Sequence, residues 1–360
     1  MKHVHEQDEV TVRRIPPTRF AAIGWLVLVL VVAATAAWEW RMRSLGLHAS
    51  DLDDSVSHWA VERRKVEAGA DDGVVVFGSS RLLFDTDLDV WEEMTGRRPI
   101  QLALPGTNPR SFLVRFAEES DFAGLVVVDV TPELYFAGFV SVFPEYQTLQ
   151  DYWQSESPSK RIGHQLGLWL SERLAFLDDQ YTLATLIERV DIPNRKGVLG
   201  PYLAVWKLSE SFADRQYRMW PRLETDRRLQ EHAKRVWMAR DRGKLDDELV
   251  TRALEESKQA VLKIRARGGD VVFVRPPSAG AYYARESKNS PRAATWDRLL
   301  RETRAFGIHF EDYPEMRNLE LPEMSHLSRE SATRFTRAYV GVLRERYVGL
   351  RSGPVAHPVP

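Results

Sequence analysis

Two serines and a glycine occupy positions where they could serve acyl transfer. Gly78, Ser79 and Ser80 follow directly on the short apolar run 74–77. A serine at a turn between a strand and a helix exposes its hydroxyl beside backbone N–H groups, which suits a nucleophile and part of an oxyanion hole. Gly106 follows the apolar run 100–104, where a glycine lets the backbone approach a reacting carbonyl, and Asn108 could add a side-chain amide. Taken alone, Gly-Ser-Ser and Pro-Gly are equally typical of plain turns.

An acid and a histidine near the C-terminus could complete this chemistry. Glu323 and His326 are three residues apart, just before a predicted helix over 329–346 for which Ser328 is a suitable N-cap. The carboxylate could orient the imidazole, and the imidazole could accept the serine proton. A Glu-x-x-His pair by itself is more often a surface pair, so its weight depends on the other segments.

The elements around these residues predict an α/β fold with a doubly wound parallel sheet. Short β-branched runs alternate with amphipathic stretches, a pattern typical of such sheets. Ligands of these folds bind at the carboxyl ends of the strands, where the candidate residues lie. The predicted strands cover 74–77, 100–104, 125–130, 270–274 and 307–310, and the predicted helices cover 91–95, 111–120, 245–267, 297–306 and 329–346.

Residues 138–243 interrupt this alternation and are predicted to form a helical, tryptophan-rich insertion. Ser157 precedes a proline and is predicted to cap one of its helices. Its tryptophans could line a glycan or lipid surface, although aromatics at helical spacing are more often core; they are Trp153, Trp169, Trp206, Trp220 and Trp237. We expect one domain over 71–350, a polar helical stalk over 39–70, and a disordered tail over 351–360.

The N-terminal region predicts a single transmembrane anchor over 20–38. These residues carry no charge, and as a helix they extend about 28 Å, close to the thickness of a bilayer core. Arginines at 13, 14 and 19 outnumber those at 41 and 43, which favours a cytoplasmic tail over 1–19 and a domain outside the cytoplasmic membrane. A buried core helix and a cleaved signal peptide, with small residues at 33–37, are the alternatives.

The order of these motifs resembles that of the SGNH (GDSL-type) hydrolase superfamily, over about 74–130 and 268–346. The resemblance implies that Ser80 is the nucleophile, that Ser80 and Gly106 donate to the oxyanion, and that Glu323 and His326 complete a triad in which Glu323 replaces the usual aspartate. The chain departs from the pattern at 130–133, where the family usually has an asparagine and this sequence has none. Asn108 could replace that donor.

The anchored layout and the loop Leu104-Pro-Gly-Thr-Asn108 look most like one branch of that superfamily. They are similar to the alginate O-acetyltransferase accessory proteins and the D-alanyl-lipoteichoic-acid transfer protein. This resemblance implies a multi-pass membrane-bound O-acyltransferase as partner and a polysaccharide acceptor. The predicted function is therefore acyl transfer in the cell envelope, as O-acyltransferase or esterase. The alternative is a catalytically inactive SGNH-like scaffold.

The composition gives no support for nucleic-acid binding, disulfide bonds or a metal site. The 50 basic and 51 acidic residues give no sign of nucleic-acid binding, and the absence of cysteine excludes disulfides. No cofactor or metal is predicted: the alternating Asp85, Asp87 and Asp89 lack the glycine and glutamate of a calcium loop, and His3 and His5 are too few. Arg81 and Arg275 could bind an anionic substrate or pair with local acids.

Overall fold

The computed structural model describes residues 20–49, 51–52, 54–67, 73–136, 146–178, 181, 205, 207–240 and 243–350. They form two units, one ending at Leu47 and the other beginning at His48. The predicted cytoplasmic tail (1–19) and disordered tail (351–360) lie outside the described residues.

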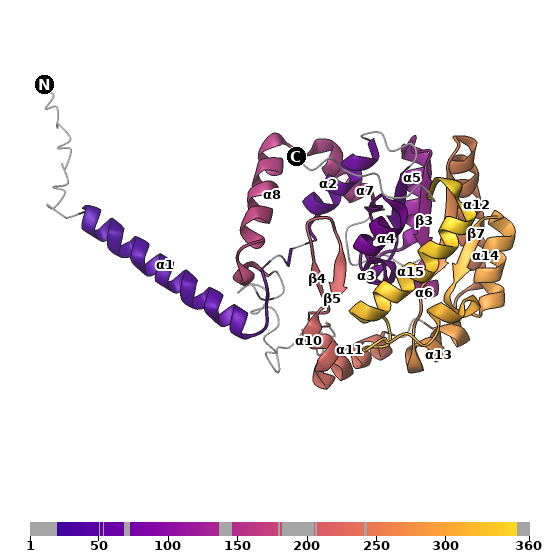
Figure 1. Cartoon of the computed structure of the whole chain (residues 1–360). Helices are drawn as coiled ribbons and strands as arrows, with labels where there is room; N and C mark the ends of the chain where they lie inside the picture. The colour runs from indigo at the N-terminus through magenta and orange to yellow at the C-terminus, as the bar shows by residue number, and fades with distance from the viewer. Residues whose placement is uncertain are drawn as a thin grey trace, which may run out of the picture. The chain divides into compact units, whose positions relative to one another are not determined.

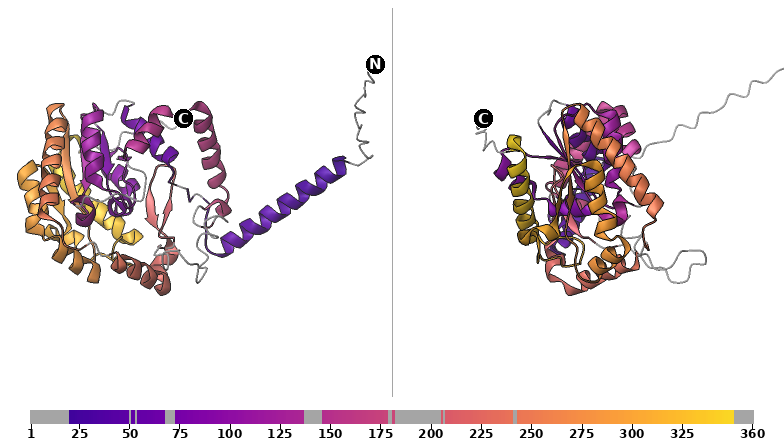
Figure 2. Two further views of the ribbon diagram at one scale, coloured as in Figure 1. Left: turned by 180° about the vertical axis from the view of Figure 1, so that it is seen from behind. Right: turned by 90° about the vertical axis from the view of Figure 1, so that its right-hand side faces the viewer.

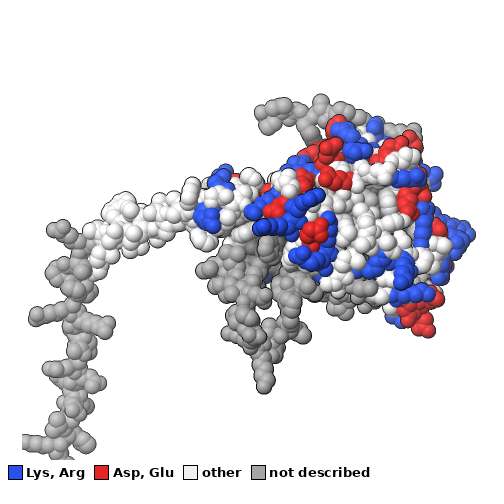
Figure 3. All heavy atoms as spheres, turned by 90° about the horizontal axis from the view of Figure 1, so that it is seen from below, with Lys and Arg blue, Asp and Glu red and all other residues white. Residues whose placement is uncertain are grey.

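The first unit contains α1 (Phe20–Ser44), which is long and apolar enough to cross a membrane. None of its most apolar window is buried, so it is not a core helix, whereas a signal sequence near an N-terminus would share these properties. The surface of α1 shows neither basic nor acidic colour over most of its length (Figure 3). Its 25 residues extend about 37 Å, enough for a bilayer core of about 30 Å.

The second unit is built on a parallel sheet whose five strands match the predicted ones (Figure 1). The strands lie in the order β2-β1-β3-β6-β7, and every neighbouring pair is parallel. The order reverses at β1, so the chain leaves β1 towards one edge and returns on its other side, which creates a crevice at the carboxyl ends. The strands are β1 (Val74–Phe77), β2 (Ile100–Gln101), β3 (Leu125–Asp129), β6 (Asp270–Arg275) and β7 (Phe306–His309).

Helices cover both faces of this sheet because its strands are apolar on both sides (Figure 2). Alternate residues along each strand enter two separate cores: Val75 and Phe77 face one, and Val74 and Val76 face the other. The first core is closed by α2 (Val56–Glu67), α5 (Pro109–Glu119), α12 (Asp247–Ala266) and α14 (Trp296–Thr303). The second is closed by α3 (Ser80–Asp85), α4 (Leu88–Thr95) and α15 (Arg329–Arg346).

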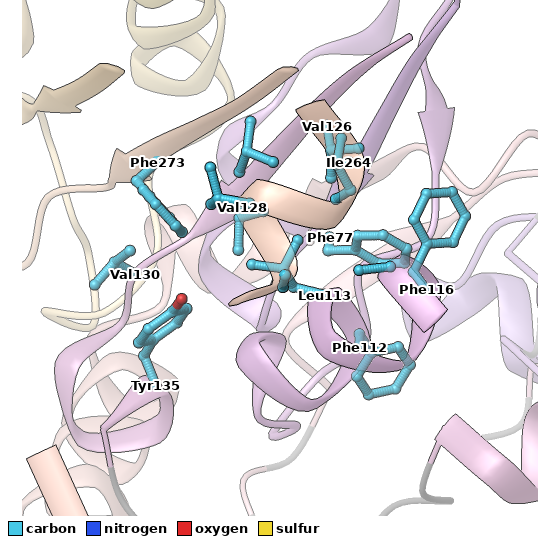
Figure 4. Close-up of a cluster of buried hydrophobic side chains, with 14 of the residues drawn as sticks. Phe77, Phe112, Leu113, Phe116, Val126, Val128, Val130, Tyr135, Ile264 and Phe273 are labelled. Atoms are coloured by element: carbon cyan, nitrogen blue, oxygen red, sulfur yellow. The ribbon is translucent and has the colours of Figure 1, made fainter. Parts of the chain in front are cut away.

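Aromatic rings pack among aliphatic side chains in the first core (Figure 4). Phe77 of β1 meets Phe116 of α5 edge-on, with ring centroids 5.0 Å apart, and Phe112 lies on the same helix. Such a buried pair adds about 1 kcal/mol to the stability given by burial alone. This packing fixes the carboxyl end of β1, where Ser79 and Ser80 lie.

The predicted stalk is wrong over α2, which belongs to the domain. Trp59 and Val66 of this helix are buried in the first core, and the indole of Trp59 donates to the Leu102 carbonyl at 3.3 Å. Arg63 is buried as well, with its guanidinium stacked on the ring of Trp153. A few large buried side chains therefore hold α2 against the domain. The high overall content of polar residues in this helix had indicated an exposed stalk instead.

The described residues of the insertion are mainly helical, as predicted, but they also form an antiparallel hairpin of β4 (Ser209–Ser211) and β5 (Tyr217–Met219). These three-residue strands lack an apolar alternation, and the buried Arg215 holds their turn by pairing with Asp54. Ser157 caps α8 as predicted. The helical elements are α7 (Tyr146–Ser155), α8 (Pro158–Ser171), η1 (Ala175–Leu177), α10 (Pro221–Thr225) and α11 (Arg227–Ala239). The remaining helical segments of the domain are α6 (Pro132–Tyr135), α13 (Gly280–Asn289), η3 (Arg292–Ala294), η4 (Phe310–Asp312), η5 (Pro314–Met316) and η6 (Val348–Leu350).

Candidate active site

The two adjacent serines after β1 have different environments. Ser79 is fully buried: its backbone N–H donates to Asp129 at 2.9 Å, and its hydroxyl bonds to Asp129 and Thr131 and caps α3. Burial raises the pKa of Asp129, although the Ser79 hydrogen bonds oppose that shift. Ser80, the first residue of α3, is partly exposed and lines a cavity. Ser79 thus ties β1 to β3, and Ser80 presents its hydroxyl.

Gly106 lines the same cavity, whereas Asn108 serves the fold. Gly106 has a φ of +65°, in the left-handed region that favours glycine. The side-chain oxygen of Asn108 accepts from the backbone N–H of Arg110 at 3.0 Å and caps α5. Asn108 is not among the described residues that line the cavity. The cap engages the amide oxygen, whereas an oxyanion donor would be the amide NH2 group, so this role of Asn108 stays a prediction.

Glu323 and His326 form a buried pair. Glu323 Oε1 lies 2.9 Å from Nδ1 of His326 and also accepts the backbone N–H groups of Ser325 and His326. Both side chains are almost completely buried, yet His326 contributes to the cavity wall. Its Nε2 atom has no hydrogen-bond partner among the described residues. A histidine fixed through one ring nitrogen, with the other free, is arranged as a general base.

The helix that carries Ser80 also holds the histidine loop. Asp85, at the end of α3, accepts the backbone N–H of Leu327 at 3.0 Å. The ring of Phe84, on the same helix, lies 4.4 Å from the His326 ring, centroid to centroid. The nucleophile and base candidates are therefore positioned by one short element, although the chain separates them by more than two hundred residues.

The insertion supplies a residue that sequence reasoning did not place in the site. The indole N–H of Trp237, on α11, donates to Glu323 Oε2, and its ring centroid lies 5.8 Å from that of His326. Glu323 thus bonds with one oxygen to the histidine and with the other to the insertion. The sequence placed Trp237 among tryptophans that either belong to a core or line a ligand surface. Nothing in the sequence indicated that it would bind Glu323.

Ser80, Gly106 and His326 line one cavity of about 470 Å³. Its wall is mixed, with apolar side chains such as Phe84 and Trp237 near the candidate residues. Asp51, Asp178 and Lys207 also line this cavity. No hydrogen bond joins the Ser80 hydroxyl to Nε2 of His326 in this structure, so the hydroxyl would have to turn towards the imidazole for a proton to move between them.

The two arginines predicted to bind substrate share one buried carboxylate. Glu286 lies 2.9 Å from Arg81 and 3.0 Å from Arg275. Burial opposes its ionisation, but the two guanidinium groups lower the pKa of Glu286. Arg275 lines a separate smaller cavity, and Arg81, although in the wall of the main one, is almost fully buried. Both guanidinium groups are paired within the protein, which favours the alternative that they pair with local acids, and the substrate role of Arg81 and Arg275 stays a prediction.

One member of the aspartate series 85, 87 and 89 caps a helix. Asp87 caps α4 by accepting the backbone N–H groups of Asp89 and Val90. In the described part of the chain, no group of three or more acidic or histidine side chains is arranged to hold a metal ion. His3, His5 and Trp206 lie outside the described residues.

No protein-family model matches this chain, and no curated protein is similar enough to indicate a relationship. The case for a functional site therefore stands on the arrangement of Ser80, Gly106, Glu323, His326 and Trp237.

Proposed function

We propose that this protein is a membrane-anchored acyl-transfer enzyme of the SGNH-like, flavodoxin-like three-layer type. It would use Ser80 as nucleophile, His326 as base and Glu323 to orient His326. The observation that carries the proposal is the buried Glu323–His326 pair, because His326 lines the same cavity as Ser80 and its Nε2 has no hydrogen-bond partner among the described residues. An imidazole held through one nitrogen, with the other unbonded, can accept a proton from a hydroxyl that turns towards it.

The proposed reaction has two halves. The Ser80 oxygen attacks the acyl carbonyl while its proton passes to Nε2 of His326, and the carbonyl oxygen becomes an oxyanion stabilised by the backbone N–H groups of Ser80 and Gly106. When the tetrahedral intermediate collapses, the leaving oxygen takes the proton from His326 and an acyl-serine remains. A second hydroxyl, deprotonated by His326, then attacks this ester and regenerates the serine.

The acceptor of the second half defines the enzyme class. A polysaccharide hydroxyl would make the protein an O-acyltransferase, and water would make it an esterase. If α1 anchors the domain outside the cytoplasmic membrane, its substrates are polymers of the cell envelope, and a multi-pass O-acyltransferase could supply the acyl group.

A second candidate function is a non-catalytic scaffold of an envelope assembly. Two observations favour it: the Ser80–His326 hydrogen bond is not formed, and Asn108 caps a helix away from the cavity. The buried histidine that a carboxylate orients and that lines the cavity with Ser80 argues against it, because a scaffold needs no such arrangement.

Labelling by a fluorophosphonate probe tests the proposal, because the probe reports an activated serine without knowledge of the substrate. In the full-length protein in detergent, we expect labelling that is abolished in Ser80→Ala and reduced about 10³-fold or more in His326→Ala. Ser79→Ala is the matched control, since it removes the neighbouring hydroxyl: it should be less stable but still react. A parent protein that does not label while folded would favour the scaffold.

A further inference from the structure

Helix α8 of the insertion exposes an apolar stripe. Its large apolar side chains recur at the spacing of one helical face, i, i+4, i+7 and i+8, and no residue of the helix is buried. The stripe consists of Ile162 (58% exposed), Leu166 (58%), Trp169 (53%) and Leu170 (40%).

The opposite side of the helix already faces the domain. His164 and Leu168 are half-buried, and the ring of His164 lies 5.7 Å from that of His58 on α2. At 100° per residue these two positions lie about 180° from the centre of the stripe. The stripe is therefore an outward face, and no described residue of the domain buries it. Exposed contiguous apolar surface of this kind marks an interaction site.

The charges around the stripe indicate its partner. Arg161 pairs with Glu156 at 3.2 Å and Arg173 lies beside Glu172, so Lys160 leaves the helix with a small basic excess. The guanidinium of Arg173 also lies 4.5 Å from the ring of Trp169. Tryptophan beside arginine, above leucine and isoleucine, is the composition of helices that lie in the interface of an anionic bilayer. A protein groove would require no such basic border.

The path of the chain brings this helix to the anchored end of the domain. Only residues 45–50 separate the end of α1 from Asp51. Asp51 bonds to Lys207, which also bonds to Asp178, seven residues beyond the end of α8. The C-terminal end of α8 is thus linked by this buried cluster to the point where the chain enters the domain. A short connection keeps this region within reach of the bilayer that α1 is suited to cross.

From these observations we infer that α8 is an interfacial helix, which inserts Ile162, Leu166, Trp169 and Leu170 into the headgroup region of an anionic bilayer. It acts as a second contact beside α1 and restricts how the anchored domain can turn at the membrane surface. The inference requires α1 to be a membrane anchor, but it is independent of the chemistry proposed for Ser80.

Spin labels on single cysteines test this inference, because the chain has no cysteine of its own. Leu166→Cys and Trp169→Cys report on the stripe. Leu262→Cys is the matched control, since Leu262 is 51% exposed on α12 and outside the insertion. The labelled full-length proteins are reconstituted into vesicles of phosphatidylglycerol and phosphatidylcholine. Collisions of the label with oxygen, which enters the bilayer, and with a water-soluble nickel chelate are then measured.

We expect the labels at 166 and 169 to be severalfold less accessible to the chelate, and more accessible to oxygen, than the label at 262. Equal chelate accessibility at all three positions would overturn the inference. So would protection at 166 and 169 in native membranes but not in the lipid vesicles, because it would assign the stripe to a protein partner. Fluorophosphonate labelling of the same samples reports on Ser80 separately, so the failure of one proposal is distinguishable from that of the other.

Discussion

Two groups of buried charged side chains lie near the carboxyl edge of the sheet, and they differ in how their charges are paired. In the Arg81–Glu286–Arg275 group, each guanidinium has a carboxylate oxygen within 3.0 Å. In the Glu323–His326 group, the carboxylate is fully engaged while Nε2 of the imidazole stays without a partner among the described residues. In the first group two guanidinium groups share one carboxylate, whereas in the second His326 lines the main cavity with its Nε2 unbonded. Burial and charge alone would not have separated an ion-paired cluster from the candidate catalytic pair.

Glu286→Ala tests the structural half of this comparison and should have the largest effect. It leaves Arg81 and Arg275 buried beside each other without a counter-charge, and breaking such a pair costs about 3–5 kcal/mol of the free energy of unfolding. Urea denaturation of the detergent-solubilised protein measures it. Glu93→Ala is the control, because Glu93 pairs with Arg337 at the exposed surface, where a pair contributes at most about 1 kcal/mol. Equal losses in the two variants would contradict a structural role for Glu286.

Trp237→Phe tests the reactive half and should have an intermediate effect. Phenylalanine keeps the ring against His326 but removes the indole N–H that holds Glu323, and a hydrogen bond to a charged group contributes about 1.5–3 kcal/mol. We expect the rate of fluorophosphonate labelling to fall about tenfold or more, with little change in melting temperature. Trp153→Phe, in the same insertion but stacked on Arg63, should leave the rate unchanged. If the labelling rate of Trp237→Phe falls only in proportion to a fall in melting temperature, Trp237 contributes packing and does not position Glu323.

Asp85→Asn should have the smallest effect. It changes α3, the helix that carries Arg81 of the first group and binds the histidine loop of the second group through Asp85. Burial raises the pKa of Asp85 well above its ordinary value, so the folded protein binds a proton that the unfolded chain has released. Between the unfolded pKa of about 4 and the higher folded pKa, the free energy of unfolding therefore decreases as pH rises.

Asparagine cannot ionise, yet its oxygen can still accept the N–H of Leu327. In the variant, the free energy of unfolding should therefore decrease less steeply as pH rises. The variant should be more stable than the parent at pH 8, but not at pH 4. Thermal melts across that range measure the difference. Parallel stability curves for parent and variant would show that Asp85 titrates normally.

The sequence by itself determined the layers of the fold. Apolar β-branched runs such as Val74–Phe77 can only be buried on both faces, so their number and spacing predicted the five parallel strands and the helices between them. The sequence also predicted helix caps: Ser157 and Ser328 are the N-caps of α8 and α15, because a serine side chain accepts a backbone N–H of the first helical turn. The uncharged stretch over 20–38 indicated α1 in the same way.

Only the tertiary structure decided which polar residues share a site. Asn108 and Gly106 are two residues apart, yet one caps a helix and the other lines the cavity, because helix geometry rather than spacing directs each. Trp237 reaches Glu323 across 86 residues of chain, and Glu286 closes on Arg81 across 205. Such contacts depend on how elements pack, and a hydrogen bond between distant residues leaves no periodicity in the sequence. The sequence thus specified the scaffold through local and apolar patterns, while packing alone decided which charges were paired and which nitrogen stayed free.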